Sequence, residues 1–271
     1  MAIRLIATDL DGTLLDSRKE ISEANLAALE RARAAGVHLT IATGRMLNSA
    51  VYFGGRIGAD VPLVCCNGGL VRKSVDEPPV FERCFEASLV RDILAFAFER
   101  GWYMQWYVGG EILARDYRPE YFNAYRTVPG FTVRGVGDDW RDYTERVLQL
   151  VVRDLSGERL DGMVAELADA FPGAFDFTAN AGIIADLMPP GVTKALGVAA
   201  LAEHLGLTAD EVMCCGDADN DLSMLRWAGT SVVPASGEPA ALALATHRAP
   251  SNDEDAIAWA VDRLVLAEKK A

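Results

Sequence analysis

The chain has 271 residues, 51% of them apolar, with 26 basic and 39 acidic side chains and a formal net charge of −13. This length suits a core domain that carries a smaller inserted one, and the negative charge argues against nucleic acid and anionic membranes as partners, because both would repel the protein. No apolar run reaches the roughly 18 residues of a membrane span, and Asp9 and Asp11 interrupt the one run that resembles a signal peptide, so we expect a cytoplasmic protein. We also expect a monomer or a homodimer.

The first predicted strand, residues 3–8, ends in two aspartates, Asp9 and Asp11, separated by a single leucine. Residues two apart on a strand point the same way, so these like charges should lie together. Such a pair is tolerated when a cation lies between the carboxylates or when one of them keeps a proton for chemistry. The alternative is a solvated turn, since Asp and Gly are common turn residues.

Helix and strand patterns alternate after this strand. A helix is expected over residues 22–35, capped by Ser22, and the apolar runs 37–42 and 61–66 predict the second and third strands. This alternation is typical of an α/β fold with a doubly wound parallel sheet, similar to a Rossmann fold. Ligands of such sheets gather at the carboxyl ends of the strands.

Residues 82–186 break the alternation. Their stretches are longer and more alternating, with helical segments near 88–100 and 157–170. We predict a separate α+β domain inserted between the third and fourth strands of the core. The core domain would then be discontinuous, over 1–81 and 187–271.

The alternation resumes after the insertion. A helix is expected from Lys194 to Leu205, and Thr208 with Glu211 has the spacing of a capping box. Apolar runs over 212–215 and 231–233 predict two more strands. The strand-like runs also hold two cysteine pairs, at 65–66 and 214–215, which lack metal or redox CxxC spacing and are interpreted as core thiols, the alternative being a regulatory thiol.

Four polar clusters stand at the predicted strand ends or helix starts: Asp9 with Asp11, residues 43–45, Lys194, and residues 216–221. A divalent metal with a phosphate accounts for all four, because carboxylates hold Mg²⁺ while hydroxyl, backbone N–H and lysine groups bind phosphate oxygens. Residues 217–221 resemble an EF-hand opening, but Leu222 and Ala228 stand where that loop needs Gly and Glu. No GxxxxGK[ST] motif occurs, and the first strand is not followed by GxGxxG.

Taken together, the motifs resemble those of the haloacid dehalogenase-like (HAD) phosphatases, most closely the Cof-type (type IIB) branch, in which a large cap follows the third motif strand. The matching segments are DLDGT at 9–13, TIATGR at 40–45, NGG at 67–69, PPGVTK at 189–194 and GDADNDLSML at 216–225. Three segments depart from the family pattern: Gly69 replaces an alanine, residues 232–240 replace an Asn-Ala loop, and residues 254–258 read EDAIA instead of EDGVA.

The resemblance implies hydrolysis through an aspartyl-phosphate. Asp9 would attack phosphorus, and Asp11 would protonate the leaving oxygen and then deprotonate the attacking water. Mg²⁺ would be held by the Asp9 carboxylate, the Asp11 backbone carbonyl and Asp217, and Lys194 would add positive charge.

The remaining candidate residues would bind phosphate or support the residues that do. Phosphate oxygens would be bound by Thr43, Gly44 and Lys194, with Asn220 at the phosphate or just behind it. Asp221 would brace Lys194 and metal-bound water. Arg45 either touches phosphate or forms a salt bridge on the following helix, and Asn67 either orients the leaving group or shapes the turn.

The expected substrate is a small phosphorylated metabolite, either a sugar phosphate or a phosphorylated cofactor such as pyridoxal phosphate or flavin mononucleotide. Eight of the 22 aromatic residues lie between Trp102 and Tyr125 in the inserted domain. Such residues usually fill the face of a sheet, but they can also stack on a flat ring. We predict that one or two of them reach the active-site cleft, among Trp106, Tyr107, Tyr117 and Tyr125.

Three alternatives remain open. A response-regulator receiver also gathers acidic residues, Thr and Lys at strand ends, but it needs adjacent acidic residues on its first strand, whereas Asp9 and Asp11 are spaced. A phosphosugar mutase of the same superfamily would return the phosphoryl group to a sugar. A catalytically silent relative would bind phosphosugars without turnover.

Overall fold

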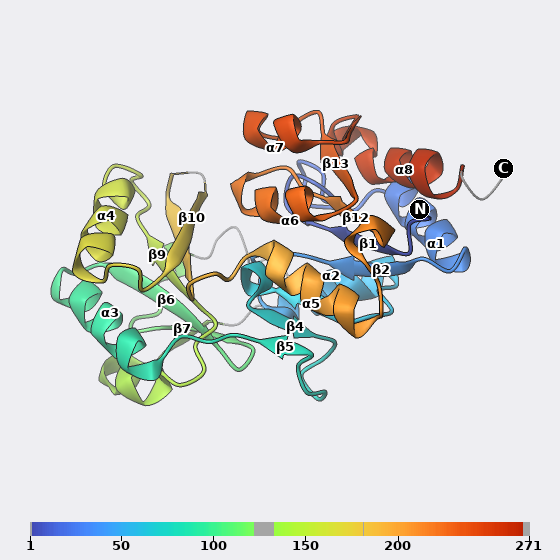
Figure 1. Cartoon of the computed structure of the whole chain (residues 1–271). Helices are drawn as coiled ribbons and strands as arrows, with labels where there is room; N and C mark the ends of the chain where they lie inside the picture. Colours follow the sequence, from blue (N-terminus) through green and yellow to red (C-terminus); the bar gives the residue numbers. More distant parts are fainter. Residues whose placement is uncertain (1, 122–132, 181, 268–271) are drawn as a thin grey trace. The chain divides into compact units, whose positions relative to one another are not determined.

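The structure is a computed structural model that describes residues 2–121, 133–180 and 182–267. Two compact units divide the chain. One comprises Met1–Phe81 with Thr193–Ala271, and the other comprises Glu82–Val192 (Figure 1). The first unit is therefore built from two segments that flank the second in sequence, and each unit is described here by itself.

A five-stranded parallel sheet forms the centre of the first unit. Its strands are β1 (Leu5–Thr8), β2 (His38–Ile41), β12 (Val212–Cys215), β13 (Thr230–Pro234) and β14 (His247–Ala249), in the order β14-β13-β12-β1-β2. β1 pairs with β12 on one side and with β2 on the other. The strand that leads to Asp9 is thus flanked by strands from both segments of the unit.

Helices cover both faces of this sheet. They are α1 (Glu23–Ala34), α2 (Leu47–Ile57), α5 (Lys194–His204), α6 (Leu222–Trp227), α7 (Pro239–Leu244) and α8 (Ala256–Ala260). The chain moves from β1 to β2 and from β12 to β14 in opposite directions along the sheet. Because crossovers between parallel strands are right-handed, α1 and α6 lie on opposite faces. Apolar residues of α5, α6 and α7 share one core cluster with Leu5 and Ala7 of β1. The predicted doubly wound α/β fold is confirmed.

The predicted helix boundaries agree closely with the structure. Ser22 precedes α1 and its side chain accepts a hydrogen bond from the N–H of Asn25. Before β12, the N–H of Thr208 donates to Oε2 of Glu211 at 2.9 Å, which completes the predicted capping box around the turn η4 (Ala209–Glu211). The other short helical turns of this unit are η1 (Cys66–Gly68), η5 (Asp219–Asp221), η6 (Asn252–Glu254) and η7 (Val261–Val265).

The third predicted strand pairs differently from expectation. β3 (Leu63–Cys65) lies in a separate three-stranded sheet with β4 (Leu70–Arg72) and β5 (Phe81–Glu82). It contacts the parallel sheet through one bridge between Ala42 and Val64 and through the Thr43 N–H, which donates to the Val64 carbonyl at 2.9 Å. The chain turns back after Cys65, and β4 pairs antiparallel with β3, with Val71 opposite Val64.

Helix α5 packs closely on β3 because it has a glycine at the contact. A Cβ on Gly197 would lie 2.5 Å from Cγ1 of Val64 and 2.8 Å from the Gly68 α-carbon. Gly197→Ala is therefore expected to lower the free energy of unfolding by about 1–3 kcal/mol, because α5 must move. Gly55→Ala in α2 is the matched control, since its Cβ would meet no described atom within 4 Å, and it should raise stability by about 0.5–1 kcal/mol. Urea unfolding measures both, and a Gly197→Ala protein as stable as the parent would contradict the expectation.

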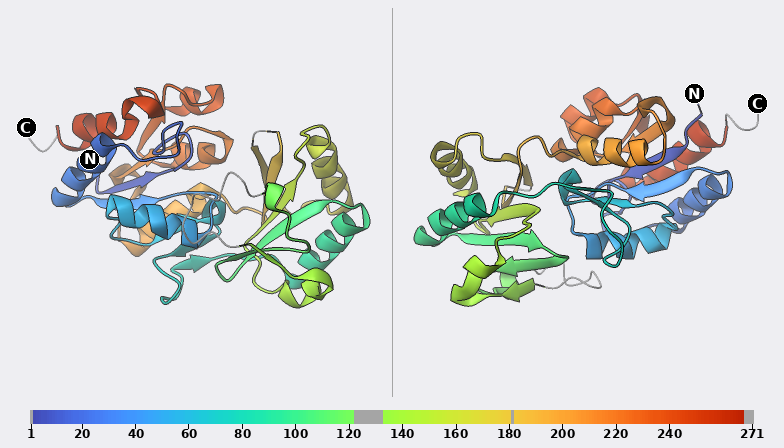
Figure 2. Two further views of the ribbon diagram at one scale, coloured as in Figure 1. Left: turned by 180° about the vertical axis from the view of Figure 1, so that it is seen from behind. Right: turned by 60° about the horizontal axis from the view of Figure 1, so that its bottom comes forward.

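The second unit contains a six-stranded sheet with two helices on one face (Figure 2). Its strand order is β10-β11-β9-β6-β7-β8, with bounds β6 (Tyr103–Val108), β7 (Glu111–Ala114), β8 (Val133–Gly135), β9 (Gln149–Arg153), β10 (Asp176–Asn180) and β11 (Ile184–Met188). Apolar residues of α3 (Ala87–Glu99) and α4 (Leu160–Ala170) pack on it, and the turn η3 (Gly137–Tyr143) precedes β9. The inserted domain was predicted to end at residue 186. In the structure β11 continues to Met188, and the second unit continues to Val192.

The aromatic residues of this unit mostly pack inside it. Trp106 is fully buried in the core under α3 and α4, and its Nε1 donates to the Tyr143 carbonyl at 2.8 Å. Of the four aromatic residues from which one or two were predicted to reach the cleft, Trp106 does not, because alternation along β6 turns it towards the helices. Tyr125 lies outside the described residues, and Tyr107 and Tyr117 remain candidates.

Among the described residues, no helix is both long and apolar enough to cross a membrane.

Candidate active site

Four site residues meet where β1 and β12 end. Asp9 follows β1 directly, and its N–H donates to the Cys215 carbonyl at the end of β12. Asp217 and Asp221 follow β12 on the turn that leads into α6. Lys194 is the first residue of α5, whose N-cap is Thr193. Parallel pairing of β1 with β12 thus brings together residues that are far apart in sequence.

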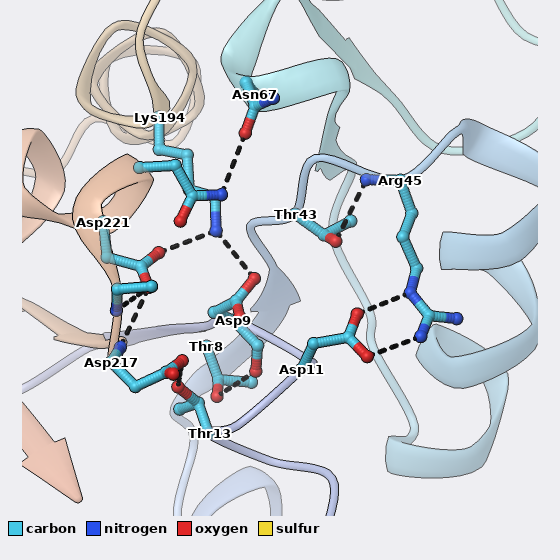
Figure 3. A network of polar contacts seen from close by, with 12 residues as sticks. Thr8, Asp9, Asp11, Thr13, Thr43, Arg45, Asn67, Lys194, Asp217 and Asp221 are labelled. Atoms are coloured by element: carbon cyan, nitrogen blue, oxygen red, sulfur yellow. Dashed lines mark hydrogen bonds and ion pairs between the residues drawn. The ribbon is translucent and has the colours of Figure 1, made fainter. Parts of the chain in front are cut away.

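The ammonium group of Lys194 lies between two carboxylates (Figure 3). Its Nζ donates to Oδ1 of Asp9 at 2.7 Å and to Oδ1 of Asp221 at 2.6 Å, and the side chains of Lys194 and Asp221 are fully buried. Burial alone would lower the pKa of Lys194, but the charges of Asp221 and Asp9 outweigh burial and raise it. Lys194 is therefore a fixed positive charge within the protein.

The negative charge of the three carboxylates around Lys194 exceeds the single positive charge of its ammonium group. Oxygens of Asp9, Asp217 and Asp221 lie within 4.8 Å of one another. Burial raises the pKa of Asp9 to about 8, with Lys194 opposing the rise and Asp221 and Asp217 adding to it. Burial and the Asp221 charge raise the pKa of Asp217 to about 6. Hard cations prefer carboxylate oxygens, so this acidic group suits a metal ion that would balance the charge left over by Lys194.

Asp221 is held mainly by the backbone. Its Oδ2 accepts hydrogen bonds from the N–H groups of Asp217 at 2.9 Å and Ala218 at 3.1 Å, while Oδ1 faces Lys194. A Cβ on Gly216 would lie 2.5 Å from Cγ of Asp221, so this close packing requires glycine. Asp221 therefore orients Lys194 and the turn that carries Asp217, as sequence analysis expected for Lys194.

Asp217 is oriented from the β1 side. Oγ1 of Thr13 donates to Oδ1 of Asp217 at 2.7 Å. Gly12, with φ of 80°, lies so close that an added Cβ would come within 2.3 Å of Oδ2 of Asp217. Residues 12 and 13 of the DLDGT segment thus hold a carboxylate from the other half of the unit.

The Asp11 carboxylate points away from this group. Nε and Nη2 of Arg45 donate to its two oxygens at 2.8 and 2.7 Å, and Nζ of Lys19 donates to Oδ1 at 3.0 Å. Burial opposes ionisation, but the hydrogen bonds and charge of Arg45, together with Lys19, lower the pKa of Asp11 to about 2. The sequence alternatives for Arg45 were a phosphate contact and a salt bridge on the following helix. The salt bridge in the structure instead joins Arg45 to Asp11, in the loop after β1.

The expected phosphate-binding residues lie on neighbouring turns. Oγ1 of Thr43 accepts a hydrogen bond from the Arg45 N–H at 3.1 Å, and Thr43 is buried. Nδ2 of Asn220 donates to Oδ1 of Asn67 at 3.1 Å, and a Cβ on Gly44 would come within 3.0 Å of the same oxygen. Asn67, in a left-handed conformation with φ of 52°, thus links the turns after β2, β3 and β12.

The structure separates the predicted residues into two groups. Asp9, Lys194, Asp217 and Asp221 form one connected group, whereas the Asp11 side chain belongs with Arg45 and Lys19. A metal site that used the Asp11 side chain would not fit this arrangement, but the prediction named its backbone carbonyl. Thr13 and Lys19 were not predicted as site residues. Thr13 belongs to the DLDGT segment, while Lys19 carries no sequence signal.

The fold and the site define an α/β enzyme whose acidic centre lies at the ends of parallel strands. The sequence-family model of the haloacid dehalogenase-like hydrolases matches residues 6–261 of this chain. The chain belongs to this family, and its enzyme class is phosphoric monoester hydrolase.

Named relatives and a solved structure match along nearly the whole chain. The 5-amino-6-(5-phospho-D-ribitylamino)uracil phosphatase of Bacillus subtilis (strain 168) is 27% identical over 262 residues, covering 94% of both chains. An HMP-PP phosphatase of Enterobacter sp. (strain 638) is 26% identical over 90% of this chain and 88% of its own. A haloacid dehalogenase-like hydrolase from Bacteroides thetaiotaomicron has a TM-score of 0.88 at 27% identity, over 96% of this chain and 99% of that one.

Proposed function

We propose that this enzyme hydrolyses small phosphorylated metabolites, sugar phosphates or phosphorylated cofactors such as pyridoxal phosphate or flavin mononucleotide, through an aspartyl-phosphate on Asp9. The observation that carries the proposal is the Lys194 ammonium, buried between Asp9 and Asp221 beside a third carboxylate. The two relatives compared above are named as phosphatases of 5-amino-6-(5-phospho-D-ribitylamino)uracil and of HMP-PP, which supports a small phosphorylated substrate.

Asp9 is proposed as the nucleophile because hydrogen bonds fix both its backbone and one of its carboxylate oxygens. Its backbone is fixed by the hydrogen bond to β12, and its Oδ1 is fixed by Lys194. The ammonium group offsets part of the repulsion between a carboxylate and a dianionic phosphate. In the first half-reaction the other Asp9 oxygen bonds to phosphorus as the ester P–O bond breaks.

Asp11 is proposed as the acid and base of the two half-reactions. In the first, Asp11 must be protonated: Arg45 and Lys19 lower the pKa of its carboxyl to about 2, and the negative charge of a bound phosphate would raise it, so that a proton can pass to the leaving oxygen. In the second, its carboxylate takes a proton from the water whose oxygen displaces Asp9 from phosphorus. Thr43, Gly44, Lys194 and Asn220 are proposed to bind the phosphate oxygens. Asn67 would hold Asn220 in place through the contact described above.

Mg²⁺ is the proposed cofactor. The carboxylates of Asp9 and Asp217, with the Asp11 backbone carbonyl, would hold it, while Asp221 keeps Lys194 and the β12 turn in position. When bound, the metal would neutralise phosphate charge and so lower the barrier to attack. The donors fit this ion because Mg²⁺ takes oxygen ligands from one or two carboxylates and the substrate phosphate.

Thr13→Val should weaken metal binding without changing the ligands. The substitution removes the hydroxyl that donates to Asp217 at 2.7 Å. Loss of such a partner typically costs about 10–100-fold in metal affinity. We expect the Mg²⁺ concentration for half-maximal phosphate release to rise by about that factor, with activity recovering at saturating Mg²⁺. Thr246→Val, at a hydroxyl that bonds Ser231 in the sheet, is the matched control and should leave the Mg²⁺ dependence unchanged.

The proposal is tested with a panel of phosphorylated metabolites, assayed for inorganic phosphate with Mg²⁺ and with a chelator. Phosphate release that requires the metal is expected. An isomerised phosphosugar without phosphate release would instead indicate a mutase, and binding without turnover would indicate a silent relative.

We also propose a cytoplasmic location, because all five cysteines are unpaired, which is typical of a reducing compartment.

A further inference from the structure

The strongest hold on the Asp11 carboxylate comes from Arg45. Two nitrogens of the guanidinium donate to its two oxygens, at 2.8 and 2.7 Å (Figure 3). A two-pronged contact of this kind fixes the plane of a carboxylate as well as its position. Lys19 adds one contact to Oδ1 from a side chain that is 57% exposed, so it restrains Asp11 less.

Arg45 is in turn fixed by helix α2. Its Nη1 donates to Oγ of Ser49 at 3.3 Å, and its guanidinium carbon lies 5.2 Å from the centre of the Phe53 ring. Ser49 and Phe53 are both buried, and the Arg45 side chain is only 12% exposed. Such anchoring removes most of the freedom that makes surface ion pairs weak.

Arg18, on the same β1–α1 loop as Asp11, forms a similar ion pair that is exposed. Nε and Nη2 of Arg18 donate to Oδ2 of Asp16 at 3.0 and 2.7 Å, so this pair also joins an arginine to an aspartate of the β1–α1 loop. The Arg18 side chain, however, is 76% exposed. Arg18 therefore serves as a matched comparison for Arg45, with similar chemistry but without the anchor on a helix.

We propose that Arg45 is a positioning residue for the proton transfer of the second half-reaction: α2 fixes Arg45, and Arg45 holds Asp11 as an oriented carboxylate, the form that takes a proton from water. The inference rests on the proposed function, in which Asp11 gives a proton to the leaving oxygen and later takes one from water. It differs from a role in phosphate binding, because Arg45 then acts on the reaction only through Asp11.

The two roles predict different kinetics. A phosphate ligand acts in every step, so its loss raises KM and slows both half-reactions with every substrate. A residue that holds Asp11 as a carboxylate affects mainly the second half-reaction, in which Asp11 takes a proton from water. With p-nitrophenyl phosphate, the leaving group departs as a stable anion, so the first half-reaction needs no proton while the second still does.

The test is rapid-mixing kinetics of Arg45→Ala with p-nitrophenyl phosphate and with an alkyl phosphate, in saturating Mg²⁺. We expect a burst of nitrophenolate equal to the enzyme concentration, followed by a steady rate lowered by about 10²–10⁴-fold. With the alkyl phosphate, kcat should fall by a similar factor, because the same second half-reaction limits turnover. Arg45→Lys, which keeps the charge but loses the two-pronged contact, should show a smaller effect of the same form. Added guanidinium ion should partly restore the steady rate of Arg45→Ala.

Three further variants separate the outcomes. Arg18→Ala should behave like the parent enzyme, and Asp11→Asn should reproduce the burst. A raised KM without a burst in Arg45→Ala, or unchanged kinetics, would overturn the positioning role while the proposed function stands. Full activity in Asp9→Asn or Asp11→Asn would instead overturn the proposed function itself. Thermal unfolding of each variant confirms that the compared proteins are folded.

Discussion

Asp9→Asn is expected to remove phosphatase activity, with kcat lowered by at least about 10⁴-fold, while the protein stays folded. The amide cannot form the acyl-phosphate bond that the proposed nucleophile forms, and losses of this size are usual when a nucleophile is removed. The fold should survive because the substitution keeps the shape of the side chain. The amide oxygen can still accept the hydrogen bond from Lys194, which also retains Asp221.

Phosphate release and thermal unfolding measure the two parts of this expectation. The control is Asp219→Asn, which changes an exposed carboxylate on the same turn as Asp217, and it should keep most of the activity. A purified Asp9→Asn protein with parental turnover would refute the assignment of the nucleophile. Loss of folding in this variant would show that the Asp9 charge is needed for the structure.

Lys194→Met is expected to lower the free energy of unfolding by about 3–5 kcal/mol, measured in a chelator. The substitution leaves Asp9 and Asp221 buried without the cation that bonds both of them at 2.6–2.7 Å. The methionine fills similar space, so the effect reports mainly the lost charge. Phosphate release should also be lost, because the same ammonium is proposed to bind the phosphate.

Adding Mg²⁺ should recover part of the stability of Lys194→Met, and more than it adds to the parent, because the ion would supply the missing positive charge. Urea unfolding with and without Mg²⁺ measures this difference. Lys73→Met, at an exposed lysine, is the matched control and should change little. An equal Mg²⁺ effect in Lys194→Met and in the parent would argue against a cation bound among these carboxylates.

The α/β fold was predictable because short local patterns in the sequence indicate its strands and helices. Apolar runs of strand length alternate with helices whose ends are marked, as at Ser22 and at the Thr208–Glu211 box. Residues that stand at the carboxyl ends of adjacent parallel strands must then lie near one another. That rule predicts that Asp9, Asp217 and Asp221 lie near one another, as they do. Lys194, at the start of a helix, was added to the group because a lysine suits a phosphate site.

The parts that were missed depend on contacts between distant residues. A strand of three residues such as β3 looks the same in sequence whether it joins a parallel sheet or turns back on β4. The direction of the Asp11 side chain is set by Arg45, 34 residues away, and by Lys19 in a loop with no pattern. Trp106 shows the same limit, because alternation along β6 places it on one face without saying which face α3 and α4 will cover.

The discontinuous first unit has a consequence for the order of folding. The ion pair between Asp9 and Lys194 joins residues 185 positions apart, and β1 needs β12 as its neighbour on one side. At about 5–20 residues per second, a ribosome adds the intervening chain in about 10–40 s. During that interval the inserted unit can already be packing its own core, while β1 still has one unpaired edge. A nascent chain stalled before residue 194 should therefore be a target for chaperones that bind exposed strands.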